Sequence, residues 1–166
     1  EVTTIANKNL GNRFIHGFSI DGFNSLTKNF KVNYSLTYTK GDDNETYGPL
    51  PSISPMFGSI SLDYNKKDLK IKAVYKFSDS KKPEDYSLGG EDGLDETPFT
   101  FDNNGLKSFL GMPKWSDFSI FASKKVSSSS TFRLGISNIF DNHYRTFASG
   151  ISAPGRSIQA GLNLKL

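Results

Sequence analysis

The sequence predicts an all-β fold, an antiparallel up-and-down meander of about seven long strands. Three observations predict it. Apolar and polar residues alternate with a period of two, no segment shows a convincing helical pattern, and short connecting segments alternate with long ones. Successive side chains of a strand point to opposite faces, so this alternation gives each strand one apolar face and one polar face.

The clearest strands are expected at residues 30–38, 69–77 and 158–166. Their alternate positions are all apolar or aromatic: Phe30, Val32, Tyr34, Leu36, Tyr38; Leu69, Ile71, Ala73, Tyr75, Phe77; Ile158, Ala160, Leu162, Leu164, Leu166. Among the positions between them, only Val74 is apolar. No helix would sort residues in this way.

Four further segments follow the alternation less strictly: 13–23, 56–65, 116–126 and 131–140. Phe121 interrupts the third of them, and the fourth loses its phase at residues 138–140. The seven expected strands are joined by three short links and three long ones, which alternate along the chain: 24–29, 66–68 and 127–130 against 41–55, 79–114 and 142–154. Alternate links of a meander lie at opposite ends of the sheet, so all the long loops are expected at one end.

Composition excludes several classes of protein. With 166 residues the chain is expected to be one domain, and 13% aromatic residues argue against disorder. The absence of cysteine excludes disulfides and thiolate catalysis, and a net charge of +3 gives no reason to expect nucleic acid as a partner. No apolar run approaches the ~18 residues of a transmembrane helix.

The apolar faces can meet one another in a soluble sandwich, or they can meet lipid in an outer-membrane barrel. Strands of about ten residues match the length that crosses a bilayer at a tilt. The sorting of loops by length also favours the barrel. Aromatic residues recur at the strand ends, where a barrel carries interfacial girdles: Phe30, Tyr38, Tyr64, Tyr75, Phe77, Trp115 and Phe118. Seven is an odd number, whereas bacterial barrels have an even number of strands, so the chain is expected to be the C-terminal part of a longer protein.

Several stretches resemble the C-terminal part of the β-barrel of TonB-dependent outer-membrane receptors, particularly the kind common in Bacteroidetes. The family's Gly-x-Pro-x-Trp matches residues 111–115, and its Gly-Val-x-Asn-Leu-Phe-Asp-x-x-Tyr-Arg matches residues 135–145. Residues 149–156 lead into the last strand as in the family, and residues 15–18 and 49–58 match earlier strand entries. The resemblance implies that residues 1–166 are a C-terminal barrel segment, with the N-terminal plug and the earlier strands lying outside it.

The resemblance also implies a function. Such receptors take up a scarce ligand, such as a ferric siderophore, haem, cobalamin or a glycan, and the uptake is energised through TonB. The implied location is the outer membrane of a Gram-negative bacterium. The implied partners are the TonB complex through the N-terminal region, the protein's own plug domain, lipopolysaccharide, and a partner surface lipoprotein. Two alternatives stay open: a passive porin, and a surface-anchoring barrel that binds a partner lipoprotein. No cofactor and no enzymatic activity are expected.

Candidate ligand contacts lie in the long loops and high on one strand: Tyr47, Tyr86, Phe99, Phe101, Trp115, His143 and Lys76. The acidic segment 79–96 carries seven carboxylates against two lysines. It is expected to be a solvated loop, with Ca²⁺ or a cationic ligand group as the alternative.

Basic residues on the polar faces gather near the short turns and are expected to face the plug rather than the ligand: Lys31, Lys70, Lys72, Arg133 and Lys165. Arg145 and Arg156 are expected at the outer rim, where they face lipopolysaccharide or pair with loop acids. Neither a catalytic residue nor a metal ligand stands out.

Overall fold

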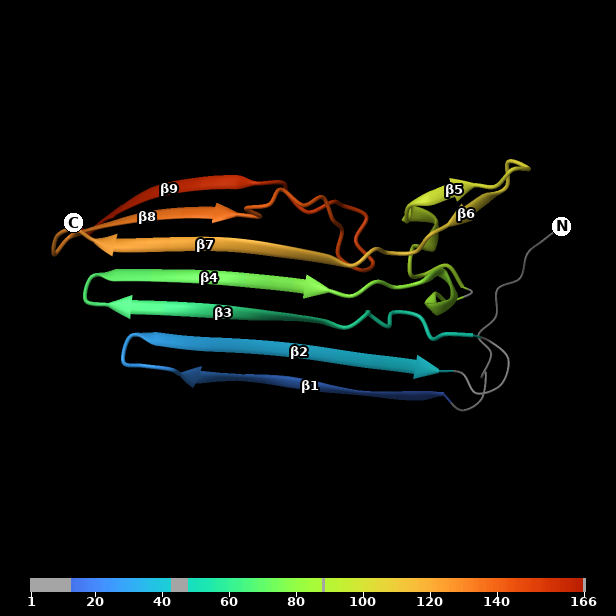
Figure 1. The fold of residues 1–166 in the computed structure, drawn as a ribbon, viewed down its shortest axis with the longest axis horizontal. Coiled ribbons are helices and arrows are strands. Elements are labelled where there is room, and N and C mark those ends of the chain that lie inside the picture. The colour runs from blue at the N-terminus through green and yellow to red at the C-terminus, as the bar shows by residue number, and fades with distance from the viewer. Residues whose placement is uncertain (1–12, 43–47, 88, 166) are drawn as a thin grey trace.

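The computed structural model describes residues 13–42, 48–87 and 89–165. Seven strands form one antiparallel sheet in the order β1-β2-β3-β4-β7-β8-β9, so each strand of the sheet lies beside the next in the chain (Figure 1). Their bounds are Phe14–Ser25 (β1), Phe30–Asp42 (β2), Phe57–Lys66 (β3), Leu69–Ser78 (β4), Trp115–Lys125 (β7), Ser130–Ser137 (β8) and Ser157–Leu164 (β9). The predicted meander is confirmed.

The register gives the sheet one apolar face and one polar face. On the apolar face, facing rings meet across strands, with centroids 5.7 Å apart for Phe18 and Tyr38. On the polar face, hydroxyls form the equivalent ladder, with Ser35 and Ser59 2.9 Å apart. Cross-strand pairs of both kinds stabilise a sheet. The alternation of apolar and polar residues in the sequence therefore corresponds to the two faces of the sheet.

The sheet contains no apolar core. Among the described residues, fifteen exposed large apolar side chains project from the apolar face and only four from the polar face. The three buried hydrophobic residues of the described chain, Leu50, Tyr86 and Met112, all lie in the long loops. No helix among the described residues is long and apolar enough to span a membrane. Among the described residues, full burial of large apolar side chains is thus confined to the loop end of the molecule.

The short turns lie at one end of the sheet and the long loops at the other, as predicted (Figure 1). Two boundaries differ from the prediction by three residues or more. Strand β2 continues through Gly41 to Asp42, and β8 ends at Ser137, three residues early. The early end has a physical cause, since Asn138 adopts a φ of 49°, which is incompatible with a strand.

The segment between β4 and β7 contains a structure that the sequence did not lead us to expect. Strands β5 (Phe99–Phe101) and β6 (Lys107–Phe109) form a separate two-stranded hairpin that projects from the loop end (Figure 1). Two 3-10 turns precede it, η1 (Pro83–Asp85) and η2 (Leu94–Glu96).

One predicted girdle residue faces the wrong way. Trp115 pairs with Ser78 in the register and has the same phase in β7 as Asp117 and Phe121, so it belongs to the polar face. The prediction that Trp115 joins an outward aromatic girdle is therefore wrong. The physical reason is the strict period of two, which puts Phe118 outward and Trp115 inward.

The ring of Phe121 occupies the space above Gly135. A Cβ at Gly135 would lie 2.8 Å from Phe121 Cδ1, whereas a Cβ at Gly161 would have nothing within 4 Å. We expect Gly135→Ala to lower the free energy of unfolding of the full-length protein by about 1–3 kcal/mol, because the ring is pushed from its position. Gly161→Ala, in the neighbouring strand, is the matched control and should change it little. Urea unfolding in liposomes measures both, and equal effects would contradict the close packing of Phe121 on Gly135.

Candidate functional site

A buried ion pair joins two of the long loops. Lys81 and Asp92 are 3.1 Å apart, and their side chains are only 4% and 2% exposed. Lys81 Nζ also donates to the carbonyl oxygen of Ile53 at 2.6 Å, and Asp92 accepts from the backbone N–H of Ser52 at 2.6 Å. Segment 48–56 is thereby attached to loop 79–114. A buried charge is tolerated only when it is paired in this way.

Aromatic rings cover the ammonium group of Lys81. The Nζ atom lies 4.3 Å from the ring centroid of Phe147 and 5.0 Å from that of Tyr86, so the third long loop (138–156) is joined to the same centre. Burial raises the pKa of Tyr86, and the nearby carboxylate of Asp92 adds to the effect. The neutral phenol is therefore the form that packs here.

The two ends of loop 79–114 are also held together. Lys81 and Met112 exchange two backbone hydrogen bonds of 2.9 Å. Gly111 has a φ of 74°, and a Cβ at this position would collide with the carbonyl oxygen of Lys81. Only glycine fits such a position easily. This contact explains why the motif at residues 111–115 begins with glycine.

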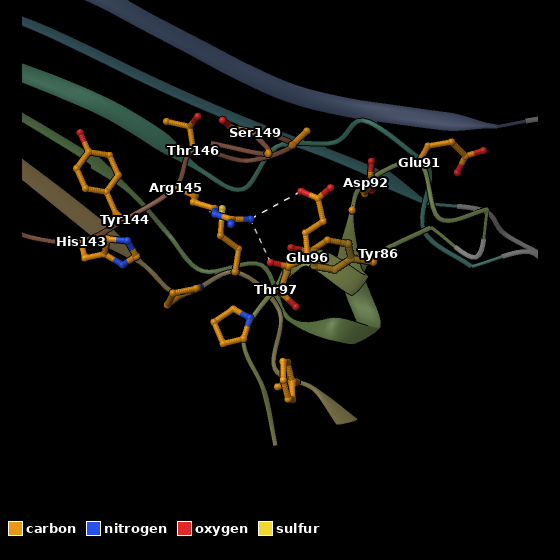
Figure 2. Close-up of a pocket in the computed structure, with 17 residues that line it drawn as sticks. Tyr86, Glu91, Asp92, Glu96, Thr97, His143, Tyr144, Arg145, Thr146 and Ser149 are labelled. Atoms are coloured by element: carbon orange, nitrogen blue, oxygen red, sulfur yellow. Dashed lines mark hydrogen bonds and ion pairs between the residues drawn. The ribbon is translucent and has the colours of Figure 1, made fainter. Parts of the chain in front are cut away.

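A cavity of about 550 Å³ lies between loops 79–114 and 138–156. Arg145 projects across it toward Glu96, as Figure 2 shows. The guanidinium donates to the Glu96 carbonyl at 3.3 Å and lies 3.7 Å from the carboxylate, and both side chains remain partly exposed, at 41% and 55%. Further lining comes from Tyr86, Glu91, Phe99, His143 and Thr146. The site thus combines an aromatic wall, carboxylates and one guanidinium.

A polar turn fixes the start of loop 138–156. Asn138 is 1% exposed, and its side-chain nitrogen donates to the carbonyl oxygens of Asn142 at 2.9 Å and Pro154 at 3.1 Å. Its side-chain oxygen accepts from the N–H of Asn142 at 3.0 Å. The side chain of Asp141 accepts from the N–H of Arg156 at 2.7 Å. These bonds bring the two ends of the loop together.

Beside this turn, Tyr144 joins the loop to strand β7. Its ring stacks on Trp115 with centroids 4.3 Å apart, and its hydroxyl donates to Asp117 at 3.0 Å. Figure 2 shows Tyr144 turned away from Arg145, the next residue. Burial, and then the hydrogen bond to Asp117, raise the pKa of Tyr144 to about 12.

This shift gives a prediction for alkaline pH. The folded state disfavours the phenolate, so the stabilisation by Tyr144 is fully present below pH 10 and is lost as the pH rises through about 12. We expect a late phenol titration in the full-length protein, from which Tyr144→Phe removes the contribution of one tyrosine while that of Tyr86 stays. Ultraviolet absorbance of the phenolate measures it. A titration complete near pH 10 would contradict the contact with Asp117.

The chain is similar to solved structures of larger proteins. Neither the protein-family models nor the curated protein sequences gave a match. Solved structures that match include the copper transporter OprC, the ferric-catecholate import receptor Fiu from E. coli K12, and the FrpB iron transporter from Neisseria meningitidis, which are TonB-dependent outer-membrane receptors. The sequence identities are 21%, 15% and 14%, and the TM-scores are 0.68, 0.63 and 0.64. In each case 92% of this chain is covered.

The chain has the fold of an outer-membrane receptor barrel. It spans only 23%, 21% and 23% of the length of those three structures, so it corresponds to part of one barrel. In such barrels the apolar face meets lipid and the polar face lines the lumen.

The structure brings some of the predicted ligand contacts of this barrel segment together and separates others. Tyr86, Phe99 and His143 line the cavity. Phe101 is 61% exposed on the β5–β6 hairpin, and Lys76 lies on the polar face of β4, opposite Asp117. Trp115 is outside the cavity lining, stacked on Tyr144, and Tyr47 lies outside the described residues.

Two expectations about the loops of the barrel segment can be compared with the structure. Arg145, expected to face lipopolysaccharide or to pair with loop acids, crosses the cavity and pairs with the loop acid Glu96. The expectation of a solvated acidic loop fails at Asp92, which the ammonium of Lys81 holds in the interior. Arg156 is exposed at the start of β9, and its backbone N–H bonds to Asp141.

Other residues of the site and its supporting loops are not among those that the sequence predicts. Glu96 and Lys81 stand out in the sequence only as loop charges, because nothing in their local sequence marks partners in other segments. Asn138 was visible as part of a motif, although its role in closing the loop was not. Within the described ranges, no three His, Asp or Glu side chains are grouped so as to hold a metal ion.

The five basic residues predicted to face the plug lie near the short-turn end. In the register, Lys31 and Lys72 both pair with Asp63, and Arg133 pairs with Ser123, as does Lys70. Lys165 follows directly on β9, and its N–H donates to Ser129 in the last short turn. Their shared face is therefore the one that lines the lumen of a barrel.

Proposed function

We propose that the chain is the C-terminal part of the barrel of an outer-membrane active transport receptor, which takes up a scarce ligand with energy supplied through TonB. The observation that carries this proposal is the two-faced sheet with every long loop at one end and a cavity among those loops. Such a sheet suits a wall between lipid and lumen. The likeness in fold to a copper transporter and to iron and ferric-catecholate receptors supports the same assignment.

The ligand site of the proposed receptor is the cavity at Arg145 and Glu96. Phe99 and Tyr86 offer aromatic surface, while Arg145 and His143 offer hydrogen-bond donors. The proposed ligand is a scarce compound such as a ferric siderophore, haem, cobalamin or a glycan. The proposed partners are the TonB complex through the N-terminal region, the protein's own plug, and the lipopolysaccharide of a Gram-negative outer membrane.

Uptake of radiolabelled ligands by cells that carry the full-length gene tests this function. We expect uptake of one ligand class to require both the gene and TonB, and Arg145→Ala to weaken binding of that ligand while the folded barrel persists. Uptake that continues at full rate without TonB would instead identify a passive porin.

A second candidate function is a surface-anchoring barrel that binds a partner lipoprotein. The observation that favours it is the projecting β5–β6 hairpin, which carries exposed large apolar side chains in and beside its strands: Phe99 49%, Phe101 61%, Leu106 66% and Leu110 56%. Exposed apolar patches often mark interaction sites. A Phe101→Ser and Leu106→Ser double variant should lose a co-purifying lipoprotein if this candidate is right, and should lose no protein partner if the hairpin serves only the ligand.

A further inference from the structure

Two lysines lie on the apolar face of the sheet at its short-turn end. The register pairs Lys66 of β3 with Leu69 of β4, and Leu69 with Lys124 of β7, so the two lysines flank one leucine in a single row. They are the only charged residues on the apolar face of strands β3, β4, β7, β8 and β9, all of which lie within the described ranges. A face that meets lipid tolerates charge near the membrane interface, where a lysine can keep its ammonium group among the headgroups.

The geometry lets both ammonium groups reach one anion. Strands β3 and β7 are separated by β4 alone, which corresponds to about 10 Å at about 4.8 Å per strand. The spacing is fixed, because the N–H of Lys125 donates to the carbonyl oxygen of Asp68 at 2.9 Å and so holds the β3–β4 turn against β7. Two lysine side chains at this spacing can both contact a phosphate that lies over Leu69.

The charge of this row is unbalanced. In the part of the chain that the structure describes, neither Lys66 nor Lys124 forms an ion pair, and both are exposed. The carboxylate nearest in sequence is Asp68, which is exposed in the turn beside Lys67. The charges of these two turn residues offset each other. Two positive charges therefore remain at the edge of the apolar face.

Beyond the lysines the surface suits an acyl chain. The next row, away from the turns, contains Tyr64, Ile71 and Ala122 on the same three strands. Phe132 pairs with Lys124 and is 41% exposed. Aromatic side chains such as Tyr64 and Phe132 are typical of the headgroup level of a membrane. Cations at this level, followed by an apolar surface, match a molecule with a phosphate at one end and acyl chains at the other.

We propose that Lys66 and Lys124 bind the phosphate of one anionic phospholipid, whose acyl chain lies over Ile71 and Ala122. The site is at the end of the sheet opposite the long loops and the ligand cavity (Figure 1). The assignment rests on the proposed function only in that the chain lies in an outer membrane. A phosphatidylethanolamine carries its own ammonium group, which the lysines repel, so an anionic lipid such as phosphatidylglycerol is preferred.

Native mass spectrometry of the full-length protein in detergent, titrated with lipid, tests this assignment. We expect the first phosphatidylglycerol to bind roughly thirtyfold more tightly than phosphatidylethanolamine, which corresponds to about 1 kcal/mol for each of the two lysines. Soluble glycerol 3-phosphate, which has the phosphate without acyl chains, should not displace the lipid. Displacement by glycerol 3-phosphate would show a site for free anions and would overturn the assignment.

Two double variants locate the preference on one face of the sheet. Lys66→Gln with Lys124→Gln should abolish the preference for phosphatidylglycerol. The matched control, Lys70→Gln with Lys125→Gln, removes two charges at the same end from the polar face and should leave the preference unchanged. Equal preferences in the two double variants would refute the assignment. Migration of the unboiled protein on gels shows whether each variant is folded.

A cross-link identifies the lipid in the native membrane. Photoreactive benzoylphenylalanine replaces Leu69 in the full-length protein, which is irradiated in its outer membrane. We expect lipid adducts that are enriched in phosphatidylglycerol relative to the composition of the membrane, and no enrichment when Lys66 and Lys124 are both glutamine. Adducts with lipopolysaccharide instead would contradict the proposed occupant.

The result can be separated from that of the proposed function. Ligand uptake by a protein without a preference for phosphatidylglycerol refutes the lipid site alone. A preference that depends on Lys66 and Lys124, in a protein that takes up no ligand, refutes the transport function alone.

Discussion

Replacing Asn138 by alanine is expected to lower the free energy of unfolding of the full-length protein by about 3 kcal/mol, about 1 kcal/mol for each of three lost hydrogen bonds. The side chain is 1% exposed, and its removal leaves the carbonyls of Asn142 and Pro154 and the N–H of Asn142 without partners. Urea unfolding in liposomes, followed by tryptophan fluorescence, measures the loss.

Two further variants separate the hydrogen bonds from the backbone conformation. Asn138→Gly suits the φ of 49° but removes the same three bonds, so it should be destabilised nearly as much. Asn163→Ala, at an exposed position of β9, should stay within about 0.5 kcal/mol of the wild type. If Asn138→Gly were as stable as the wild type, the backbone conformation, rather than the hydrogen bonds, would be what Asn138 provides.

Breaking the buried ion pair is expected to have the second large effect. Lys81→Met leaves Asp92 as an unpaired buried carboxylate, and Asp92→Leu leaves the ammonium of Lys81 unpaired, each at a cost of about 3–5 kcal/mol to the local structure. The long loops then separate, because both residues also bond to segment 48–56. Limited proteolysis of intact cells should cut these loops much faster than in the wild type.

The exposed pair Lys82 and Glu84 provides the control. Their charged groups are 3.7 Å apart, but the side chains are 70% and 68% exposed. Exposed pairs contribute little, so Lys82→Met should leave the proteolysis rate unchanged. The double variant Lys81→Met with Asp92→Leu should recover part of the resistance, since no charge stays unpaired. If Lys81→Met were as resistant as Lys82→Met, the buried pair would not be what holds the loops.

The sheet could be predicted from the sequence because its determinants are local. Alternation at Phe30 to Tyr38 and at Leu69 to Phe77 fixes both the strands and their faces, and link length fixes which end carries the loops. The inward position of Trp115 also has a local signal, since its phase matches Phe121 rather than Phe118. The β5–β6 hairpin also had a local signal, the run Asp102-Asn103-Asn104-Gly105 between apolar segments.

The cavity could not be predicted in the same way, because its contacts join residues far apart in the chain. Arg145 meets Glu96 across 49 positions, and Asp92 meets Ser52 across 40. A charged residue in a polar segment has the same local sequence whether it is solvated or paired in the interior. Whether Lys81 is solvated or paired is decided by the packing of three loops around it. This packing leaves no periodic pattern in the sequence.

The position of Leu50, Tyr86 and Met112 in the loops rather than the sheet has a consequence for engineering. Chimeras that transplant a single loop from another barrel would separate Lys81 from Asp92, Ile53 or Phe147 and so expose this small core. The three loop segments should therefore be exchanged together, with the strands left unchanged: 48–56, 79–114 and 138–156. New specificities would arise by replacing the set.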